Sequence, residues 1–263
     1  MSALLQARGL TVRVGACTAC RGLDLDLRPG ERWAVLGRNG AGKTTLLLTL
    51  AGLHPAAAGE VRLADRPLAA LPRREIARRL GLLPQDDADP FPATVLETVL
   101  LGRHPHMDPW RGETGADLDA ARAALARVGL AGLEGRNVRT LSGGERRRVA
   151  LATLLAQDPA VALMDEPTGH LDLHQQVALL AETVCWAREG AGRALVMVLH
   201  DPALAWRACT HALLLHGDGA WTAGPVGEVL ETACLARLYG HPLHRADGPD
   251  GPVWWPRWPI DRV

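Results

Sequence analysis

A glycine-rich run that contains a single lysine, at residues 37–45, has the residue types and spacing that bind the phosphates of a nucleotide. Glycines reach backbone angles that are closed to other residues, so successive N–H groups can turn inward onto an anion. We expect Lys43 to reach the β- and γ-phosphates and the Thr44 hydroxyl to bind Mg²⁺. The predicted phosphate loop consists of Gly37, Arg38, Asn39, Gly40, Ala41, Gly42, Lys43, Thr44 and Thr45.

The basic residues of the chain set this loop apart from an ordinary glycine-rich turn. Of the 29 basic residues, 28 are arginines and the remaining one is Lys43. Such a bias against lysine is typical of a genome-wide preference, so the retention of one ammonium group points to a function. A compact ammonium fits inside a glycine loop, whereas the planar, five-donor guanidinium of arginine does not. The composition therefore favours nucleotide binding over a structural turn.

Two adjacent acids, Asp165 and Glu166, follow the apolar residues 161–164, which predict a buried strand. At the end of such a strand, one carboxylate can hold Mg²⁺ through water while the other polarises an attacking water. A solvent-facing pair is the alternative, and the four apolar residues before the acids argue against it.

Strands and helices must position these groups. A buried strand at 32–36 leads into the phosphate loop, and an apolar helix at 46–51 follows it. Two further strands end on polar side chains, at Gln85 and at His200. Because small residues and free helix-start N–H groups meet just ahead of the helix that reaches residue 156, a second anion cradle is expected there. It consists of Ser142, Gly143 and Gly144.

The rest of the chain falls into segments of different type. An alternation with a period of two predicts antiparallel strands within residues 4–36, joined by a glycine-rich connection at 15–22. Residues 90–140 form a mainly helical insertion between sheet-forming halves. The tryptophan- and proline-rich tail is either an extended strand that covers apolar surface or a strip that binds a partner. Further predictions are a strand at 59–64, a basic, solvated helix at 71–80, helices at 94–103, 116–128 and 173–188, and a hairpin of 213–215 with 220–222.

Composition excludes several classes of protein. The formal net charge is zero, so no nucleic-acid partner is expected. No apolar run approaches the roughly 20 residues of a membrane span, and the N-terminus lacks a secretory pattern, so we expect a cytoplasmic protein. Cys17 and Cys20 are better explained as a pair in a strand or hairpin than as a metal or redox site. His170 and His174 have metal-ligand spacing, but a turn histidine and a helix-surface histidine are the better explanation.

Taken together and in this order, these motifs resemble those of the ATP-binding subunits of ABC transporters, over about residues 4–240. The most specific motif is Leu-Ser-Gly-Gly-Glu at 141–145, some 20 residues before the acidic pair. The resemblance implies an α/β fold with a P-loop NTPase (RecA-like) core, an antiparallel β subdomain and a helical subdomain at about 90–157. The ATPase domain would then span residues 1–240, with a C-terminal extension at 241–263.

The resemblance also implies roles for individual residues. Asp165 would hold Mg²⁺ with Thr44 and Gln85, Glu166 would activate water, and His200 would contact the γ-phosphate. Gln85 would link the nucleotide to the membrane subunit. Two cassettes of the family dimerise head to tail, so the cradle of one closes on the nucleotide of the other. Asp172 would lie in the loop that crosses this interface. Phosphoryl transfer needs positioning and charge neutralisation, which agrees with this arrangement.

Three partners follow from the same resemblance: a second ATPase subunit, integral membrane permease subunits and a substrate-binding protein. The subunit would sit peripherally on the cytoplasmic face of the inner (plasma) membrane. Residues 97–106 are most similar to importers of iron-siderophores, haem and cobalamin. Phe91, which lies between two prolines in an otherwise polar loop, is predicted to line a groove for the membrane subunit with the helix at 95–103 and the loop at 104–107; the alternative is that its ring folds back to cover the helical insertion.

Two departures from the family and three alternatives accompany this interpretation. Val14 stands where the family often has an aromatic residue that stacks on adenine, so the preference for ATP over GTP is open. Gly169 and His170 replace the commoner pair of small residues before Leu-Asp.

An ATPase of an exporter or of another importer class is one alternative function. The second alternative, a non-transport ABC protein, is disfavoured by the neutral formal charge. The third, a P-loop kinase, would leave residues 141–145 and His200 unexplained.

Overall fold

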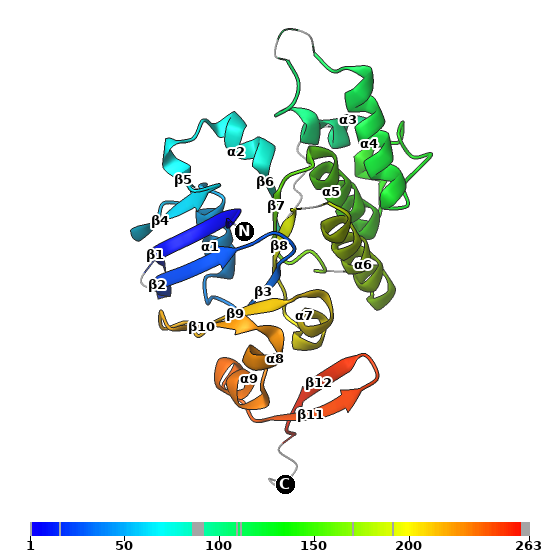
Figure 1. The fold of residues 1–263 in the computed structure, drawn as a ribbon. Helices are drawn as coiled ribbons and strands as arrows, with labels where there is room; N and C mark the ends of the chain where they lie inside the picture. The colour runs from blue at the N-terminus through cyan, green and yellow to red at the C-terminus, as the bar shows by residue number, and fades with distance from the viewer. Residues whose placement is uncertain are drawn as a thin grey trace.

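The structure, a computed structural model, describes residues 2–15, 17–85, 92–108, 110, 112–169, 171–190 and 192–258. Its centre is a six-stranded sheet with the strand order β10-β9-β3-β8-β7-β6 (Figure 1). All neighbours in this sheet are parallel except β9 and β10, which form the predicted hairpin. The strands are β3 (Arg32–Gly37), β6 (Leu80–Leu83), β7 (Val161–Met164), β8 (Ala194–Val198), β9 (His211–Leu215) and β10 (Trp221–Pro225).

The parallel order gathers the predicted site residues at one edge of this sheet. Because parallel strands point in the same direction, the residues that follow them meet at the carboxyl edge, where α/β proteins bind ligands. The phosphate loop follows β3, and the two acids follow β7. Gln85 and His200 follow the neighbouring strands β6 and β8.

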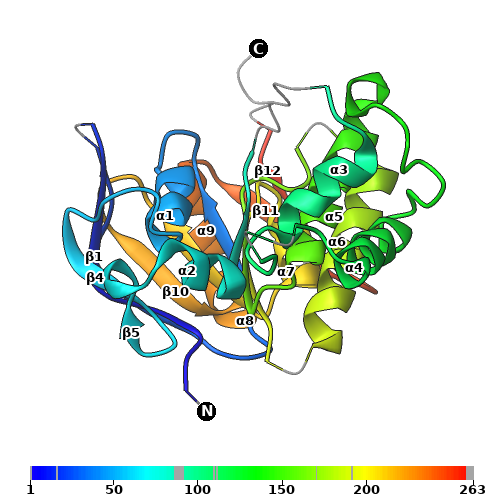
Figure 2. The same cartoon turned by 90° about the horizontal axis from the view of Figure 1, so that it is seen from above.

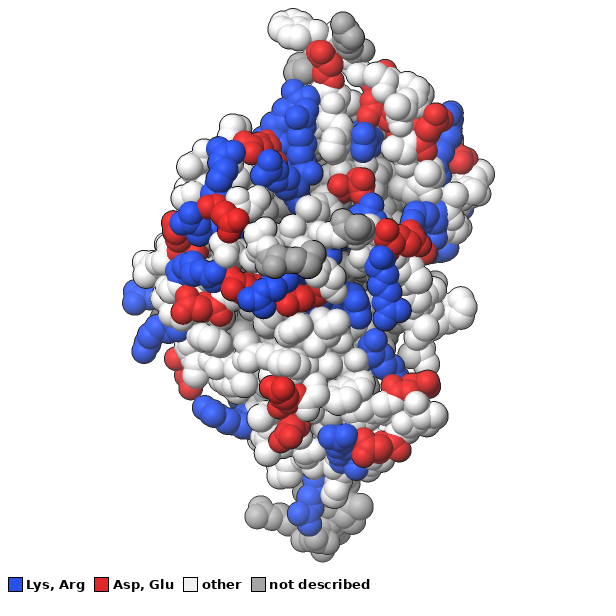
Figure 3. Space-filling model, viewed as in Figure 1, with Lys and Arg blue, Asp and Glu red and all other residues white. Residues whose placement is uncertain are grey.

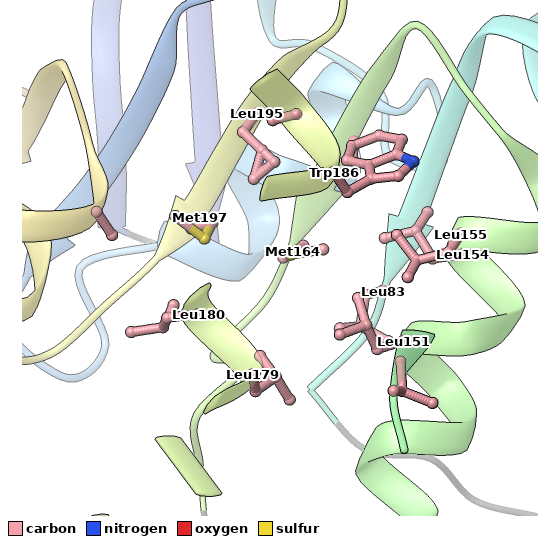
Figure 4. Packing of buried hydrophobic residues seen from close by; sticks show 14 of the residues in the cluster. Leu83, Leu151, Leu154, Leu155, Met164, Leu179, Leu180, Trp186, Leu195 and Met197 are labelled. Atoms are coloured by element: carbon pink, nitrogen blue, oxygen red, sulfur yellow. The ribbon is translucent and has the colours of Figure 1, made fainter. Parts of the chain in front are cut away.

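Side chains of the central strands alternate between two hydrophobic cores. On β3, Trp33 and Val35 join the core that contains α1 (Lys43–Leu50), whereas Ala34 and Leu36 join the core on the opposite face. This is the period of two expected of a strand that is buried on both faces. Figure 4 shows the second core, in which strand residues meet helix residues: Leu83, Met164, Leu195 and Met197 with Leu151, Leu154, Leu155, Leu179, Leu180 and Trp186.

An antiparallel sheet with the order β2-β1-β4-β5 covers the face that carries α1. Its first hairpin corrects the predicted glycine-rich connection at 15–22, because β2 already begins at Cys17. Gly22, at a φ of 61°, lies within β2 where the pairing register with β1 shifts, so it forms a bulge rather than a loop. The strands are β1 (Leu5–Val14), β2 (Cys17–Leu27), β4 (Ala58–Leu63) and β5 (Arg66–Pro67).

The predicted helical insertion is present, on the side of the central sheet away from α1 (Figure 2). Thr94 and Thr114 each form a capping box that begins a helix, and Ser142 does the same for the longest helix of the insertion. The helices are α3 (Val95–Leu100), α4 (Gly115–Arg127) and α5 (Gly143–Gln157), with 3₁₀ turns at Leu101–Arg103 and Val138–Thr140. The chain continues into α6 (Leu173–Glu189), α7 (Pro202–Ala208), α8 (Val226–Val229) and α9 (Thr232–Tyr239).

Helix α2 (Arg73–Arg79), which follows a 3₁₀ turn at Leu68–Ala70, is the predicted basic surface helix: it buries Ile76, whereas Arg73, Arg74 and Arg78 are exposed. Acidic and basic side chains are interspersed over most of the face seen in Figure 3, with a group of basic side chains toward the top of the view. Arg74 and Arg78 donate to the Pro105 carbonyl over 2.9 and 2.8 Å. These two exposed arginines thus also contact the loop that follows α3.

The C-terminal tail forms a hairpin of β11 (Leu243–Gly248) and β12 (Gly251–Pro256) that packs on α7. The rings of Trp206 and Trp254 meet edge to face, with centroids 6.2 Å apart. The Arg245 guanidinium lies 5.9 and 5.8 Å from these two ring centroids. The hairpin thus covers apolar surface through Trp254, as one of the two alternatives for the tail predicted, while the partner-binding strip stays a prediction.

Candidate active site

The residues after β3 turn sharply before α1 begins at Lys43. Gly40 and Gly42 have φ values of 80° and 89°, in the left-handed region that glycine enters at little cost. A Cβ atom at Gly42 would lie 2.4 Å from the Cβ of Ala19 on β2, so no side chain fits there. Strand, glycine turn and helix therefore have the geometry of a phosphate loop, with the helix N-terminus aimed at the turn.

The Lys43 ammonium is buried beneath this loop. Its Nζ donates to the carbonyls of Gly37 and Arg38 over 3.0 and 3.2 Å. Burial lowers the pKa of Lys43, and the nearby charges of Glu166 and Asp165 oppose that shift. The only lysine of the chain thus lies between the loop and the acidic pair, where it can neutralise phosphate oxygens.

Asp165 is buried at the end of β7, and it fits a hard divalent cation. Burial raises the pKa of Asp165, while a hydrogen bond with the Thr44 side chain acts in the opposite direction. Its Oδ1 atom is buried and has no hydrogen-bond partner among the described residues. The Thr44 hydroxyl and a carboxylate oxygen that accepts no hydrogen bond are oxygen ligands of the kind that suits Mg²⁺.

Glu166 carries the carboxylate that the site arranges most closely. His200 Nε2 lies 2.7 Å from Glu166 Oε1, and Gln85 Nε2 donates to Glu166 Oε2 over 3.2 Å. Glu166 itself has a φ of 45°, which is unusual for a residue with a side chain. The structure thus brings together the three residues that sequence analysis had placed at the ends of separate strands.

A pocket of about 280 Å³ lies over the phosphate loop and ends at Glu166. Val14 of β1, with 39% of its surface exposed, is the aliphatic side chain on its wall, and no aromatic residue is among the described residues that line it. The lining residues are Val14, Asn39, Gly40, Gly42, Lys43, Thr44, Thr45, Gln85 and Glu166. The departure at Val14 is therefore located at the pocket itself.

The second predicted cradle does not line this pocket. Ser142 is exposed at the start of α5, where its Oγ accepts from the Glu145 N–H over 3.2 Å. Asp172 is likewise exposed and caps α6 by accepting from Gln175 N over 2.8 Å. A Cβ atom at Gly144 would lie 2.4 Å from Gln175 Oε1, so the starts of α5 and α6 adjoin. The cradle and Asp172 thus share a surface away from their own phosphate loop.

Two residues of this region, Arg147 and Tyr239, were not predicted from the sequence. Arg147 of α5 is buried beneath the acidic pair and donates to the Asp165 carbonyl over 2.9 Å. Its position one helical turn before Leu151, on the buried face, was an available signal. The hydroxyl of Tyr239 donates to the His200 carbonyl over 3.3 Å. Its sequence context gave no sign of this contact.

Three further predictions concern the docking groove, the histidine pair and the cysteine pair. Phe91 and His170 lie outside the described residues, so the predicted docking groove and histidine pair stay predictions. His174 is exposed on α6. Cys17 and Cys20 lie on β2, and no group of three potential metal-binding side chains occurs among the residues that the structure describes.

Comparison with known proteins agrees with this geometry. The family model described as ABC transporter matches residues 20–169. A hemin import ATP-binding protein from Streptomyces coelicolor is 43% identical over 242 residues, which cover 91% of this chain and 84% of that protein. A ferric enterobactin transport ATP-binding protein from Escherichia coli is 36% identical over 90% of this chain and 88% of its own length.

Solved structures have the same fold. A chain of a metal-chelate type ABC transporter in an inward-facing conformation matches with a TM-score of 0.85 at 27% identity, covering 97% of this chain and 98% of that one. An ATP-binding cassette in its ADP conformation matches with a TM-score of 0.78 at 20% identity, covering 91% of this chain and all of that one.

Fold and site together define a P-loop ATPase with an antiparallel and a helical subdomain. The chain belongs to the ABC transporter family, as an ATP-binding subunit that hydrolyses ATP for transport. None of its described helices is long and apolar enough to cross a membrane.

Proposed function

We propose that this chain powers an importer of haem or of a ferric siderophore. The observation that carries the proposal is the similarity to relatives named for hemin import and for ferric enterobactin transport, which extends over nine-tenths of this chain. The proposal does not extend to cobalamin, because neither of these relatives is named for it.

Within the site, the backbone N–H groups of the phosphate loop and Lys43 would bind the phosphates. Thr44 and Asp165 would hold Mg²⁺, whose charge would offset that of the phosphate oxygens when it is bound. Glu166 would accept a proton from the attacking water. The oxygen of that water would bond to the γ-phosphorus while the bond between this phosphorus and the ADP oxygen breaks. His200 and Gln85 would keep the Glu166 carboxylate directed toward the pocket, as their contacts of 2.7 and 3.2 Å do here.

A second copy of the chain would complete this site. Ser142, Gly143 and Gly144 begin α5 and lie outside the pocket of their own subunit, so they would act on the nucleotide of a partner. The exposure of Ser142 and Asp172 supports an interface there. The dimer would bind permease subunits at the cytoplasmic face of the inner membrane, in a complex that also includes a substrate-binding protein.

Transport by the reconstituted complex tests the cargo. The chain and its co-purified membrane subunits would be placed in proteoliposomes that contain ATP. Binding protein that carries either haem or a ferric catecholate siderophore would be added outside. We expect ATP-dependent uptake of one of these two ligands and loss of uptake with Glu166→Gln. Uptake of neither ligand, or uptake that continues without ATP, would contradict the proposal.

A further inference from the structure

Arg147 inserts a buried guanidinium beneath the acidic pair, from a helix that carries a different part of the machinery. The side chain is 6% exposed, although it lies in a run of three arginines. Among the residues that the structure describes, its three nitrogens donate to five backbone carbonyls. These belong to Pro84 (2.7 Å), Gln85 (3.3 Å), Asp165 (2.9 Å), Glu166 (3.0 Å) and Pro167 (3.1 Å).

The five acceptors belong to two separate segments. Pro84 and Gln85 directly follow β6, and residues 165–167 directly follow β7. These strands are parallel neighbours, so their ends lie side by side but have no covalent link. A guanidinium is a rigid planar fork with five N–H donors, which suits a ring of carbonyls that points inward from both segments. Arg147 therefore joins the Gln85 segment to the Glu166 segment.

The backbone of Glu166 needs such support. Its φ of 45° places a residue with a Cβ in the left-handed region, and such residues persist only where the surroundings hold them. Arg147 Nη2 donates to the carbonyls on either side of this conformation, those of Asp165 and Glu166. The side chain on that backbone is the carboxylate that meets His200 and Gln85.

We propose that Arg147 is a positioning residue for hydrolysis, which holds the Glu166 and Gln85 peptides in the geometry that directs the Glu166 carboxylate at the pocket. This inference rests on the proposed role of Glu166. Arg147 lies on α5, five residues after Ser142, so it also joins the helix that would act on the partner's nucleotide to the acid of its own subunit. Closure of the dimer would thereby reach both sites through one helix.

Substitution of Arg147 by methionine and by lysine tests the inference, with Arg148→Met as the matched control. Arg148 is its neighbour on the same helix but donates to the Val128 carbonyl, at the end of α4. We expect Arg147→Met to lower kcat about 10- to 100-fold, the scale of a small misplacement of a reacting group, with little change in ATP affinity. Lysine has too few donors for these carbonyls, so the kcat of Arg147→Lys should lie between that of the unsubstituted chain and that of Arg147→Met. Arg148→Met should keep its kcat.

A double variant separates positioning from a general structural role. If Arg147 acts through Glu166, Arg147→Met should cause no further loss of kcat in a Glu166→Gln background, because residues that act as a unit are not additive. A merely structural defect would multiply with it. Thermal unfolding and the stoichiometry of bound nucleotide would be measured on the same preparations. If the methionine variant does not fold, Arg147→Lys carries both criteria.

The outcomes are distinct. An unchanged kcat in Arg147→Met, or a loss that multiplies fully with Glu166→Gln, would overturn the inference. A normal kcat in Glu166→Gln alone would instead contradict the proposed role of Glu166. A reduced kcat with retained ATP affinity in Arg147→Met, together with no further loss of kcat in the Glu166→Gln background, would establish Arg147 as the residue that positions the acid.

Discussion

His200 Nε2 lies 2.7 Å from Glu166 Oε1, and this contact joins the ends of two neighbouring strands of the central sheet. Gln85, from the strand on the other side of β7, donates to the second carboxylate oxygen over 3.2 Å. The carboxylate is therefore held from both sides by groups on other strands. Its direction depends on the order of the strands as well as on its own loop.

Replacement of this carboxylate should separate binding from hydrolysis. Glu166→Gln keeps the size of the side chain but removes the proton acceptor, so we expect retained ATP binding and hydrolysis slowed by about tenfold or more. Phosphate release and the binding of a fluorescent ATP analogue would be measured together. Glu60→Gln on the exposed part of β4 is the control. Near-normal turnover in Glu166→Gln would remove this residue from the proposed role.

The proposed dimer should depend on the start of α5. Glu166→Gln with ATP should elute as a dimer in size-exclusion chromatography with light scattering, because slow hydrolysis preserves the closed state. A second substitution, Ser142→Trp, should return it to the monomer, since the exposed cradle would no longer approach a partner's nucleotide. A monomer under all nucleotide conditions, or a dimer unaffected by Ser142→Trp, would count against this interface.

Asp165 should make the folded protein less stable at neutral pH than a neutral side chain would. Burial raises the pKa of Asp165 above its usual 3.8, so the folded state disfavours the ionised form. This penalty is absent at low pH, where the group is protonated in both states; it grows as pH rises above the unfolded value of 3.8 and is complete once pH exceeds the folded pKa. Asp165→Asn should therefore raise Tm at neutral pH, and the difference should shrink as pH falls toward 3.8.

Differential scanning fluorimetry of the nucleotide-free protein across this range provides the measurement. The same variant should lose stabilisation by Mg²⁺ and ATP, because its amide is a weaker ligand for the cation. A lower Tm for Asp165→Asn at neutral pH would show that its charge stabilises the fold, and the stated cause of the pKa shift would be wrong.

Tyr239 offers a test of the contact behind His200. Burial raises the pKa of Tyr239 to about 12, and it is the only tyrosine of the chain. Phenolate absorbance should therefore titrate with a midpoint near 12 in the folded protein, and near the usual value of 10 in urea. Circular dichroism at each pH would show that the fold persists. A midpoint near 10 in folded protein would mean that the hydroxyl is exposed rather than bound to the His200 carbonyl.

Much of the fold followed from local patterns in the sequence. Residues 161–164 and 194–198 are apolar on both faces, and only strands of a sheet that is covered on both sides bury such runs. The connection at 15–22 was the error, because glycine serves equally in a loop and in a bulge. What decides between them is the pairing of β1 with β2, which a single strand's sequence does not contain.

The site was predictable where a motif carries its own chemistry. Gly37 to Thr45 and the acidic pair indicated their ligands before any contact was known. Arg147 was not predictable in the same way, because its acceptors are backbone carbonyls, which every residue possesses. Tyr239 also acts on a carbonyl, from a helix near the end of the chain. Contacts of a side chain with a distant backbone leave no pattern of residue types in the sequence.

The burial of a unique lysine beneath the phosphate loop also makes this chain its own probe. A protease that cuts only after lysine has a single target, the bond between Lys43 and Thr44, at the first turn of α1. The intact fold shields that bond, so scission into residues 1–43 and 44–263 would report how often this turn opens. Any molecule that occupies the loop would slow the cut in proportion to its occupancy. Nucleotide binding could thus be followed on the unmodified protein, without a label, from the appearance of two fragments.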